Sequence, residues 1–364
     1  MLDGTCYMTR NEPSSLPAPQ MEEDPRFLTE QIVTYLGNKR SLLHFLGTGL
    51  EQVKKRLGKE RLKAGDLFSG SGIVARFLKQ HSEDLIVNDL EEYSRVVNTC
   101  YLSNAEEVEN LELDRHYRRL LRYMETHESP GFITELYAPK NPDCITADDR
   151  VFYTRRNAVY LDTARQTISL LPAEVRPYFI APLLAEASVH TNTSGVFKGF
   201  YKDRNGIGKF GGTGGNALSR ILGEISLPFP VFSRFDCRYS IHCRDANELA
   251  AELPEMDVVY LDPPYNQHPY GSNYFMLNLL SSYEKPEETS RVSGIPADWK
   301  RSTYNSRQHA PEALFRLLED CPAKFILLSY SSEGFINYEE MTGFLGRLGH
   351  TVTPVSYTHL RAHE

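Results

Sequence analysis

Hydrophobic positions change their spacing along the chain, and the spacing predicts alternating helices and strands. Over 41–57 the apolar residues recur every three or four positions, as they do on one face of a helix. The apolar runs at 64–68 and 84–87 are short and continuous, which is typical of buried strands. Residues 73–80 between them, and the stretch that ends at Cys100, have helical spacing again. This order predicts the opening of a doubly wound α/β fold.

The alternation stops at about residue 104 and resumes near residue 238, as judged from periodicity. The later part has predicted strands at 239–243, 257–261, 324–330 and from Thr351, and predicted helices at 247–253, 311–319 and 338–348. The interrupting part has predicted helices at 114–127, 157–171 and 177–189, followed by a glycine-rich segment at 194–216. We therefore expect one α/β domain, formed by 27–103 and 235–355, with a mostly helical insertion at 104–234. Residues 1–26 contain four prolines among small polar residues and are predicted to be a flexible leader.

Composition and charge narrow the class of protein. The 364 residues are 41% hydrophobic and 24% charged, as in an ordinary globular protein. No apolar run approaches the ~18 residues of a membrane span, and the N-terminus lacks the pattern of a secretory signal. Six cysteines without a Cys-x-x-Cys pair predict reduced thiols in the cytoplasm, with no disulfide framework and no metal site. The net charge of −8 excludes an overall basic coat but allows a local basic surface for nucleic acid.

The stretch Asp262-Pro263-Pro264-Tyr265 directly follows the predicted strand at 257–261. Each proline fixes φ and lacks an N–H, so the turn is stiff and its carbonyls are free to accept hydrogen bonds. Open α/β sheets bind their ligands at this end of a strand. A carboxylate and a carbonyl can accept from one amino group while a ring stacks on a flat heterocycle. The stretch therefore predicts a grip for the exocyclic amine of a base, with an ordinary proline-rich turn as the alternative.

Two upstream elements suggest a nucleoside ligand beside this grip. A loop containing Phe68, Gly70 and Gly72 follows a strand that includes Asp66, and glycines let backbone approach a ligand closely. The loop lacks the third glycine of the dinucleotide fingerprint, which favours an adenosyl group over a pyrophosphate. Asp89 ends the next strand, where an acid can accept from both ribose hydroxyls. A solvated loop acid is the alternative for that residue.

Further candidate residues are less specific. Tyr35 and Lys39 flank Gly37 and suit a ligand carboxylate and aliphatic chain, although an exposed cationic helix start is the simpler reading. Asp245 follows a strand and can accept from an adenine amine or merely cap a helix. A glycine-rich segment with interleaved aromatic residues suits phosphate contact, or is a solvated loop. Its basic residues are Lys198, Lys202, Arg204, Lys209 and Arg220.

Together these motifs resemble the Dam-type DNA adenine-N6 methyltransferases of restriction–modification systems, in both content and order. The motifs that carry the resemblance are Tyr35-x-Gly37-Asn38-Lys39, Asp66-Leu67-Phe68-x-Gly70-x-Gly72, Asn88-Asp89 and Asp262-Pro263-Pro264-Tyr265. The segments at 192–198, 300–302 and 329–330 are also similar to restriction–modification members. The resemblance implies a Rossmann-like S-adenosylmethionine-dependent methyltransferase sheet whose insertion is a target-recognition domain.

The resemblance also implies a role for each motif residue. Tyr35 and Lys39 would hold the methionine end of S-adenosylmethionine, and Asp89 its ribose. The remaining cofactor residues would be Asp66, Phe68, Gly70, Gly72, Asp245 and Asp262. Asp262 and the Pro263 carbonyl, stiffened by Pro264, would grip the target amine while Tyr265 stacks on a flipped adenine. The five basic residues of the glycine-rich segment would contact DNA.

The implied activity is methylation of adenine N6 at specific sites in double-stranded DNA, without a metal. The implied setting is the cytoplasm of a prokaryote or a phage-infected cell, with a cognate restriction endonuclease encoded nearby. The alternatives are an RNA or protein-amide methyltransferase, which more often has Asn where Asp262 stands, and a truncated, non-catalytic DNA-binding relic. A truncated protein is considered because residues 356–364 do not continue the family pattern and are predicted to be a non-native tail. His359 and His363 in that tail lack a third ligand, so a metal pair is not expected.

Overall fold

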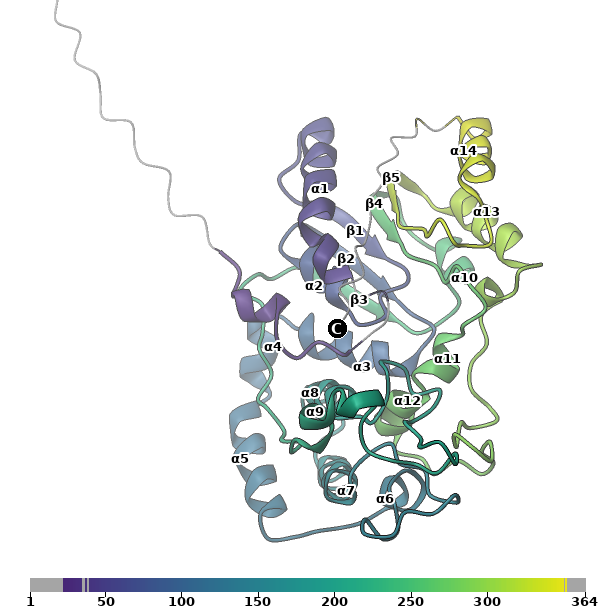
Figure 1. Cartoon of the computed structure of the whole chain (residues 1–364). Coiled ribbons are helices and arrows are strands. Elements are labelled where there is room, and N and C mark those ends of the chain that lie inside the picture. The colour runs from purple at the N-terminus through teal and green to yellow at the C-terminus, as the bar shows by residue number, and fades with distance from the viewer. Residues whose placement is uncertain (1–21, 35–36, 38, 350, 352–364) are drawn as a thin grey trace, which may run out of the picture.

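The computed structural model describes residues 22–34, 37, 39–349 and 351, and these form two halves (Figure 1). The upper half in Figure 1 contains a five-stranded sheet, and the lower half is made of helices. The strands are β1 (Leu62–Asp66), β2 (Ser82–Asn88), β3 (Arg238–His242), β4 (Met256–Leu261) and β5 (Ala323–Leu328). All neighbouring strands are parallel, in the order β3-β2-β1-β4-β5. The α/β fold class predicted from the sequence is therefore confirmed.

The central strand β4 shows why these residues form the middle of a sheet. All six of its residues are buried, as expected for a parallel strand covered on both faces. Val258 and Tyr260 face one hydrophobic cluster, and Val259 and Leu261 face another. The helices on the first side are α1 (Leu43–Leu57) and α2 (Ile73–Lys79). The helices on the second side are α10 (Ala246–Ala250), α13 (Ala310–Asp320) and α14 (Tyr338–Arg347).

The order of the strands creates a switch point between β1 and β4. From β1 the chain moves outward through β2 to β3, and it later returns to β4 on the other side of β1 and continues to β5. The connections leaving β1 and β4 therefore diverge, which opens a crevice at the carboxyl ends of these strands. Ligands of open α/β sheets bind in such a crevice.

The helical half packs around one extensive hydrophobic core. Its helices are α4 (Ala105–Asn110), α5 (Leu113–Met124), α6 (Phe132–Tyr137), α7 (Arg155–Ser169), α8 (Pro177–Val189) and α9 (Leu218–Leu222). Three further helices, α3 (Glu92–Tyr101), α11 (Tyr270–Asn273) and α12 (Phe275–Ser282), come from outside the predicted insertion. Side chains of α3 and α12 belong to the same core as α7 and α8. The two halves thus share buried surface, with α3 beside α8 and β3.

Several predictions need correction. The strand predicted at 64–68 ends at Asp66, because Leu67 and Phe68 already turn into the glycine loop. Of the predicted leader the structure describes residues 22–26, where the Glu23 carboxylate accepts from the Arg234 amide and η1 (Pro25–Leu28) begins. α12 was not predicted. The expectations for a strand beyond Thr351, for the tail and for residues 1–21 lie outside the described residues.

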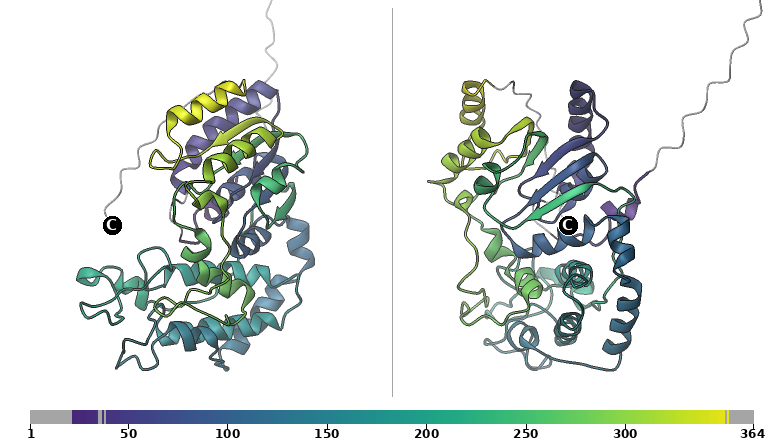
Figure 2. Two further views of the ribbon diagram at one scale, coloured as in Figure 1. Left: turned by 90° about the vertical axis from the view of Figure 1, so that its right-hand side faces the viewer. Right: turned by 180° about the vertical axis from the view of Figure 1, so that it is seen from behind.

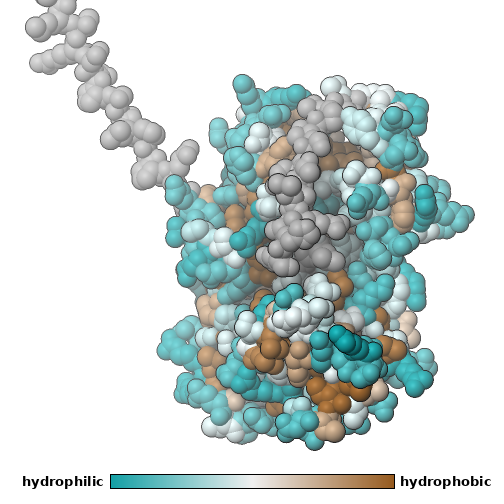
Figure 3. All heavy atoms as spheres, in the orientation of Figure 1, coloured by the Kyte–Doolittle hydropathy of each residue, from teal (hydrophilic) through white to brown (hydrophobic). Residues whose placement is uncertain are grey.

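Figure 2 shows the segment around α9 projecting from the helical half, away from the sheet. Hydrophobic side chains gather on the face of the helical half drawn in Figure 3, including the area over α9. Leu218 and Leu222 of that helix are exposed. Within the described residues no helix is long and apolar enough to span a membrane.

Candidate functional site

A pocket lies at the carboxyl ends of the strands, beside the switch point. It collects side chains from the ends of four strands and from two segments that cross in front of them. The strand ends contribute Leu67, Phe68, Asn88, Asp89, Leu90, Glu91, Arg244, Asp245, Ala246, Asp262 and Pro264. The crossing segments contribute Tyr270, Gly271, Lys300, Ser302, Tyr304 and Asn305. Sequence-predicted residues from three separate motifs therefore meet at one cavity.

The glycine loop between β1 and α2 has the backbone that its glycines permit. Gly70 and Gly72 have φ of 50° and 76°, in the left-handed region that side chains disfavour. A Cβ on Gly72 would also lie 2.9 Å from Oδ1 of Asn98, so there is no space for one. The loop closes with a 2.7 Å hydrogen bond from the Gly72 amide to the Ser69 carbonyl. Leu67 and Phe68 at the start of this loop line the pocket, whereas Gly70 and Gly72 are not among its lining residues.

Asp89 ties the glycine loop to the end of β2. Its Oδ2 accepts from the Gly70 amide at 2.7 Å, and its Oδ1 accepts from the Glu91 amide at 2.9 Å. Burial raises the pKa of this carboxyl, while the two amide bonds and nearby Lys300 oppose the rise. The carboxylate is therefore held in a fixed orientation on the pocket wall, where it has acceptor capacity left for a ligand.

Asp66, the last residue of β1, is the most unusual acid of the site. Its side chain is fully buried, and neither carboxylate oxygen has a hydrogen bond of good geometry within the described residues. Burial raises its pKa well above the usual range, and the charges of Asp262 and Asp89 add to this. The nearby amides of Phe68 and Ala75 only moderate the rise. An acid without partners costs stability unless a ligand supplies a donor or positive charge.

Asp262 begins the turn after β4 and is paired with a lysine from the other end of the sequence. Lys39 Nζ lies 2.7 Å from Asp262 Oδ2 and also donates to the Gly37 carbonyl at 2.9 Å. Burial raises the pKa of Asp262, and Lys39 together with the Ser329 hydroxyl opposes that rise. The structure thus brings two predicted site residues into direct contact. Tyr35, predicted to act with Lys39, lies outside the described residues.

The rest of the turn is braced by the segment that follows β5. The Tyr265 carbonyl accepts from the Phe335 amide at 3.1 Å, and the Tyr265 ring meets Tyr330 edge to face, with ring centres 6.2 Å apart. Pro263 is buried, whereas Pro264 lines the pocket. The aromatic ring and the acid are therefore held on one rigid turn, as the two prolines predict.

Asp245, which follows β3, caps a helix, as one of the two interpretations of the sequence expects, and its contact with an adenine amine stays a prediction. Its Oδ1 caps α10 by accepting from the amides of Asn247 and Glu248 at 2.8 and 3.3 Å. The residue also lines the pocket. Because both capping bonds use the same oxygen, Oδ2 is directed to no described backbone amide and has capacity for a ligand.

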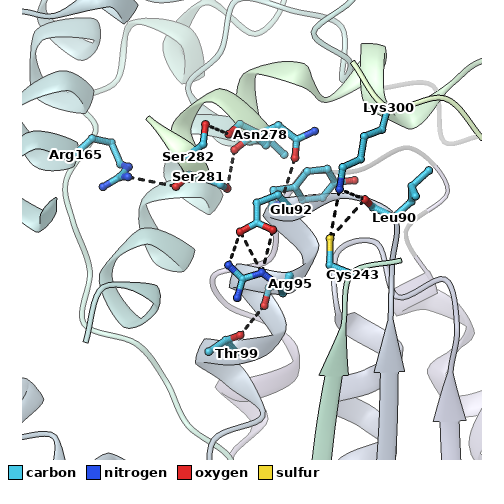
Figure 4. A network of polar contacts seen from close by, with 12 residues as sticks. Leu90, Glu92, Arg95, Thr99, Arg165, Cys243, Asn278, Ser281, Ser282 and Lys300 are labelled. Carbon is cyan, nitrogen blue, oxygen red and sulfur yellow. Dashed lines mark hydrogen bonds and ion pairs between the residues drawn. The ribbon is translucent and has the colours of Figure 1, made fainter. Parts of the chain in front are cut away.

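Sequence reasoning missed the residues of the outer pocket wall. Buried Glu91 accepts from Asn278 Nδ2 of α12 at 2.6 Å, and burial raises its pKa to about 7. Lys300 Nζ donates to the Leu90 carbonyl at 2.8 Å (Figure 4). The segment at 300–302, which resembles restriction–modification members, was the one sequence signal for this wall, but the sequence assigned it no function. Nothing in the sequence distinguished Glu91.

The basic segment forms a short hairpin whose tip is exposed. Residues Lys202 and Gly208 pair as an antiparallel bridge, and the Asp203 carboxylate accepts from the amides of Asn205 and Ile207 at 2.8 and 2.9 Å. The side chains of Lys198, Lys202 and Arg204 are exposed and that of Lys209 is partly exposed. This arrangement presents four positive charges on a stiff, protruding loop.

Arg220, the fifth predicted DNA contact, is surrounded by backbone acceptors. Its guanidinium donates to the carbonyls of Val189, Thr191 and Thr193, the last two at 3.0 and 3.2 Å. These bonds tie the chain after α8 to α9, so Arg220 has a structural use. Its predicted contact with DNA stays a prediction. Among the described residues, no group of three or more His, Cys, Asp or Glu side chains is arranged to hold a metal.

The fold and the site define a parallel α/β protein with an acid-rich pocket at the carboxyl ends of its strands. A family comparison gives the particular class: the model for D12 class N6 adenine-specific DNA methyltransferases matches residues 35–344. The chain belongs to this family. Its members methylate adenine N6 in DNA, so the family match favours DNA over the RNA and protein-amide alternatives.

Curated relatives are type II methyltransferases. The chain is 29% identical to methyltransferase M.CviAII of Paramecium bursaria Chlorella virus 1, over 87% of this chain and 89% of that protein. It is 26% identical to M.NlaIII of Neisseria lactamica, with the same coverage. It is also 26% identical to M.FokI of Planomicrobium okeanokoites, over 85% of this chain but 46% of that protein. No solved structure matches the chain significantly.

Proposed function

We propose that this chain transfers a methyl group from S-adenosylmethionine to N6 of an adenine flipped out of double-stranded DNA. The observation that carries the proposal is the placement of Asp262. This acid lies at the carboxyl end of β4, is paired with Lys39, and adjoins a pocket lined by further acids. The proposal names the cofactor, the site residues and the base-flipping step for a chain that belongs to an adenine-N6 methyltransferase family.

The charge of the pocket supports a cationic cofactor. S-Adenosylmethionine, when bound, supplies an electrophilic methyl group on a positively charged sulfonium. Asp262, which lines the pocket, supports this fit directly, and buried Asp66 behind the wall adds to the negative potential there. Asp89 adds negative charge nearby. The same acids favour the cationic cofactor over the demethylated product, which lacks the sulfonium charge.

The nucleoside end of the cofactor suits the other side of the pocket. We assign the ribose hydroxyls to Asp89 and the adenine amine to Oδ2 of Asp245. Phe68 and Tyr304, whose rings meet edge to face with centres 5.2 Å apart, provide apolar wall between them. Gly70 and Gly72 would let the loop backbone approach the ligand without a Cβ in the way.

At the amine grip, Asp262 and the Pro263 carbonyl would each accept one N–H of the target N6. The lone pair of this nitrogen is delocalised into the adenine ring, so it is a weak nucleophile. Two acceptors on the rigid turn draw the N–H bonds out of the ring plane and direct the lone pair to the methyl donor. Positioning and fixed electrostatics of this kind are worth up to ~7–11 kcal/mol of barrier in ideal alignment.

The same turn would also hold the base itself. N6 is unreachable in a stacked duplex, so the adenine must be extruded, at a cost of a few kcal/mol. The Tyr265 ring, braced by Tyr330, offers a stacking face that offsets part of that cost. Lys39 holds Asp262 in orientation through their ion pair until substrate engages it.

We infer that the insertion at 104–234 is the target-recognition domain. Its exposed basic hairpin offers four positive charges against the single charge of Asp203, although the whole chain carries −8. Phosphate contacts of this type position a protein on DNA, whereas base-edge contacts determine the recognised sequence. We further infer action in the cytoplasm of a prokaryote or phage-infected cell, together with a cognate restriction endonuclease.

Purified protein, unmethylated DNA and S-adenosylmethionine test the proposal directly. Calorimetry should show binding of the cofactor, and single-molecule sequencing should show N6-methyladenine in one sequence context. Methylation of cytosine, or no cofactor binding by folded protein, would contradict the proposal. Cofactor binding without any transfer would instead identify a non-catalytic relic.

A further inference from the structure

One segment of the pocket wall has, apart from the ring of Tyr304, no role in the proposed reaction. Residues 299–305, here called the strap, run in front of the pocket between the helical half and α13, and four of them line it. We propose that the strap retains the cofactor and that Lys300 is the positioning residue that fastens it. This inference rests on the proposed use of S-adenosylmethionine and adds what controls its release.

The C-terminal end of the strap is firmly attached. The buried Tyr304 donates its hydroxyl to Asn247 Oδ1 at 2.7 Å, and its ring packs on Phe68 of the glycine loop. Asn305 Nδ2 donates at 2.8 Å to the carbonyl of Asn266, the residue after Tyr265. This end of the strap therefore contacts both the cofactor wall and the turn that grips the amine.

The other end is fastened by a single exposed side chain. Lys300 Nζ reaches across the rim of the pocket to the Leu90 carbonyl at 2.8 Å and the Cys243 sulfur at 3.6 Å (Figure 4). These acceptors lie just beyond β2 and β3, beside the acids assigned to ribose and adenine. A bond here joins the strap to the two strand ends that would hold the nucleoside.

Close packing at Gly271 brings the strap backbone within reach of that rim. A Cβ on Gly271 would lie 2.5 Å from the Lys300 carbonyl oxygen, and 3.1 Å from both Glu91 Oε1 and the Trp299 ring. A side chain at this position would therefore push the strap outward. The Trp299 ring is partly buried here and stacks with the Arg301 guanidinium, whose central carbon is 4.4 Å from the ring centre.

These contacts predict how the strap acts. A nucleoside bound to Asp89 and Asp245 would have the strap as its outer wall, so it leaves when the fastened end opens. The Lys300 bond stabilises the closed position, and closing is required for retention but not for the chemistry at Asp262. Loss of the bond should thus speed cofactor dissociation and leave the transfer step unchanged. Because one charge-assisted hydrogen bond near solvent is lost, we expect cofactor dissociation to become about tenfold faster.

The chain contains a natural reporter, because Trp299 is its single tryptophan. We would measure cofactor dissociation by Trp299 fluorescence after rapid mixing, and affinity by calorimetry. Lys300→Met should raise Kd and the dissociation rate about tenfold, with kcat at saturating cofactor and DNA affinity unchanged. Lys300→Arg should recover most of the affinity. Lys285→Met is the matched control, since Lys285 is exposed and paired with Glu135 away from the pocket.

Gly271→Ala provides an independent test from the other side of the strap, and it should show the same faster release. Wild-type dissociation rates in both Lys300→Met and Gly271→Ala would overturn the strap inference while leaving the proposed function intact. A fall in kcat with unchanged cofactor affinity would also overturn it. Failure of the wild-type protein to bind S-adenosylmethionine by calorimetry would instead refute the proposed function, so the two failures are distinguishable.

Discussion

The acid-lined pocket and the basic hairpin place their charged groups in opposite environments. At the pocket, burial raises the pKa of Asp262 and Lys39 opposes the rise, while buried Asp66 behind it has its pKa raised by burial and by the charge of Asp262. On the hairpin, Lys198, Lys202 and Arg204 stand in solvent. A buried charge interacts strongly with its few neighbours because little water or salt screens it, whereas each exposed charge is screened and contributes little by itself. A single substitution in the pocket should therefore abolish or weaken its function, whereas several substitutions are needed to weaken DNA binding by the hairpin.

The largest effect is expected at the amine grip. Asp262→Ala removes an acceptor that would act in the transition state, so methyl transfer should fall about 10³-fold or more. The Lys39 ammonium would lose its partner, but the fold should persist. Transfer of labelled methyl to DNA measures the loss, and circular dichroism checks the fold. Substantial transfer by the variant would remove Asp262 from the mechanism.

The junction between the two halves should respond to pH. The folded-state pKa of Glu91 is raised from 4.5 to about 7, chiefly by burial, so its contribution to stability declines as pH rises from 4.5 to 7. Above pH 7 the ionised, buried Glu91 carboxylate lowers the free energy of unfolding by roughly 3 kcal/mol relative to low pH. Glu91→Gln keeps an acceptor for Asn278 and should be more stable than wild type at pH 8, but not at pH 4. If wild type and Glu91→Gln unfold at the same denaturant concentration at pH 8, the Glu91 carboxyl does not have a raised pKa in the folded protein.

The hairpin should be sensitive as a group. Replacing Lys198, Lys202 and Lys209 together with Ala should weaken DNA binding about 10²-fold near physiological salt. The slope of log affinity against log salt should become shallower by about 2.7. A control triple variant changes the exposed lysines Lys55, Lys140 and Lys285. If both variants bind DNA alike, the hairpin is not the interface and the contrast with the pocket fails.

The smallest effect is expected at the ribose acid. Asp89→Asn keeps a side-chain acceptor for the Gly70 amide but removes the charge, so the Kd for S-adenosylmethionine should rise about tenfold. DNA affinity should not change, which separates the pocket from the hairpin. Unaltered cofactor affinity in calorimetry would argue against the ribose assignment.

Sequence reasoning worked best where local chemistry confines a residue. The two prolines and the buried run before them placed Asp262 at the end of a strand, and the glycines placed the loop beside it. It failed where partners come from distant segments. Glu91 carries no local signal, and the family-like segment at 300–302 gave Lys300 no role, because both roles depend on the strap and on α12 passing the pocket. That these residues bind the cofactor and DNA stays a prediction.

Two further differences between the sequence pattern and the fold have local causes. α12 was overlooked because an apolar run such as 275–280 suits a buried strand as well as a helix. Arg220 was assigned to the predicted DNA contacts by its charge alone. In the fold its guanidinium donates hydrogen bonds to three backbone carbonyls. Charge patterning records where a cation lies in the sequence but not which acceptors the folded chain brings to it.

The isolated carboxylate of Asp66 has a consequence for the abundance of the protein in a cell. A buried acid with no well-formed hydrogen bond among the described residues destabilises the empty fold, and a ligand that binds only the folded state shifts the equilibrium toward it. The thermal midpoint should therefore rise with S-adenosylmethionine concentration. Molecules made while the methyl donor is scarce would unfold more often and reach proteases sooner. The supply of methyl donor would then set how long each copy survives as well as how fast it works.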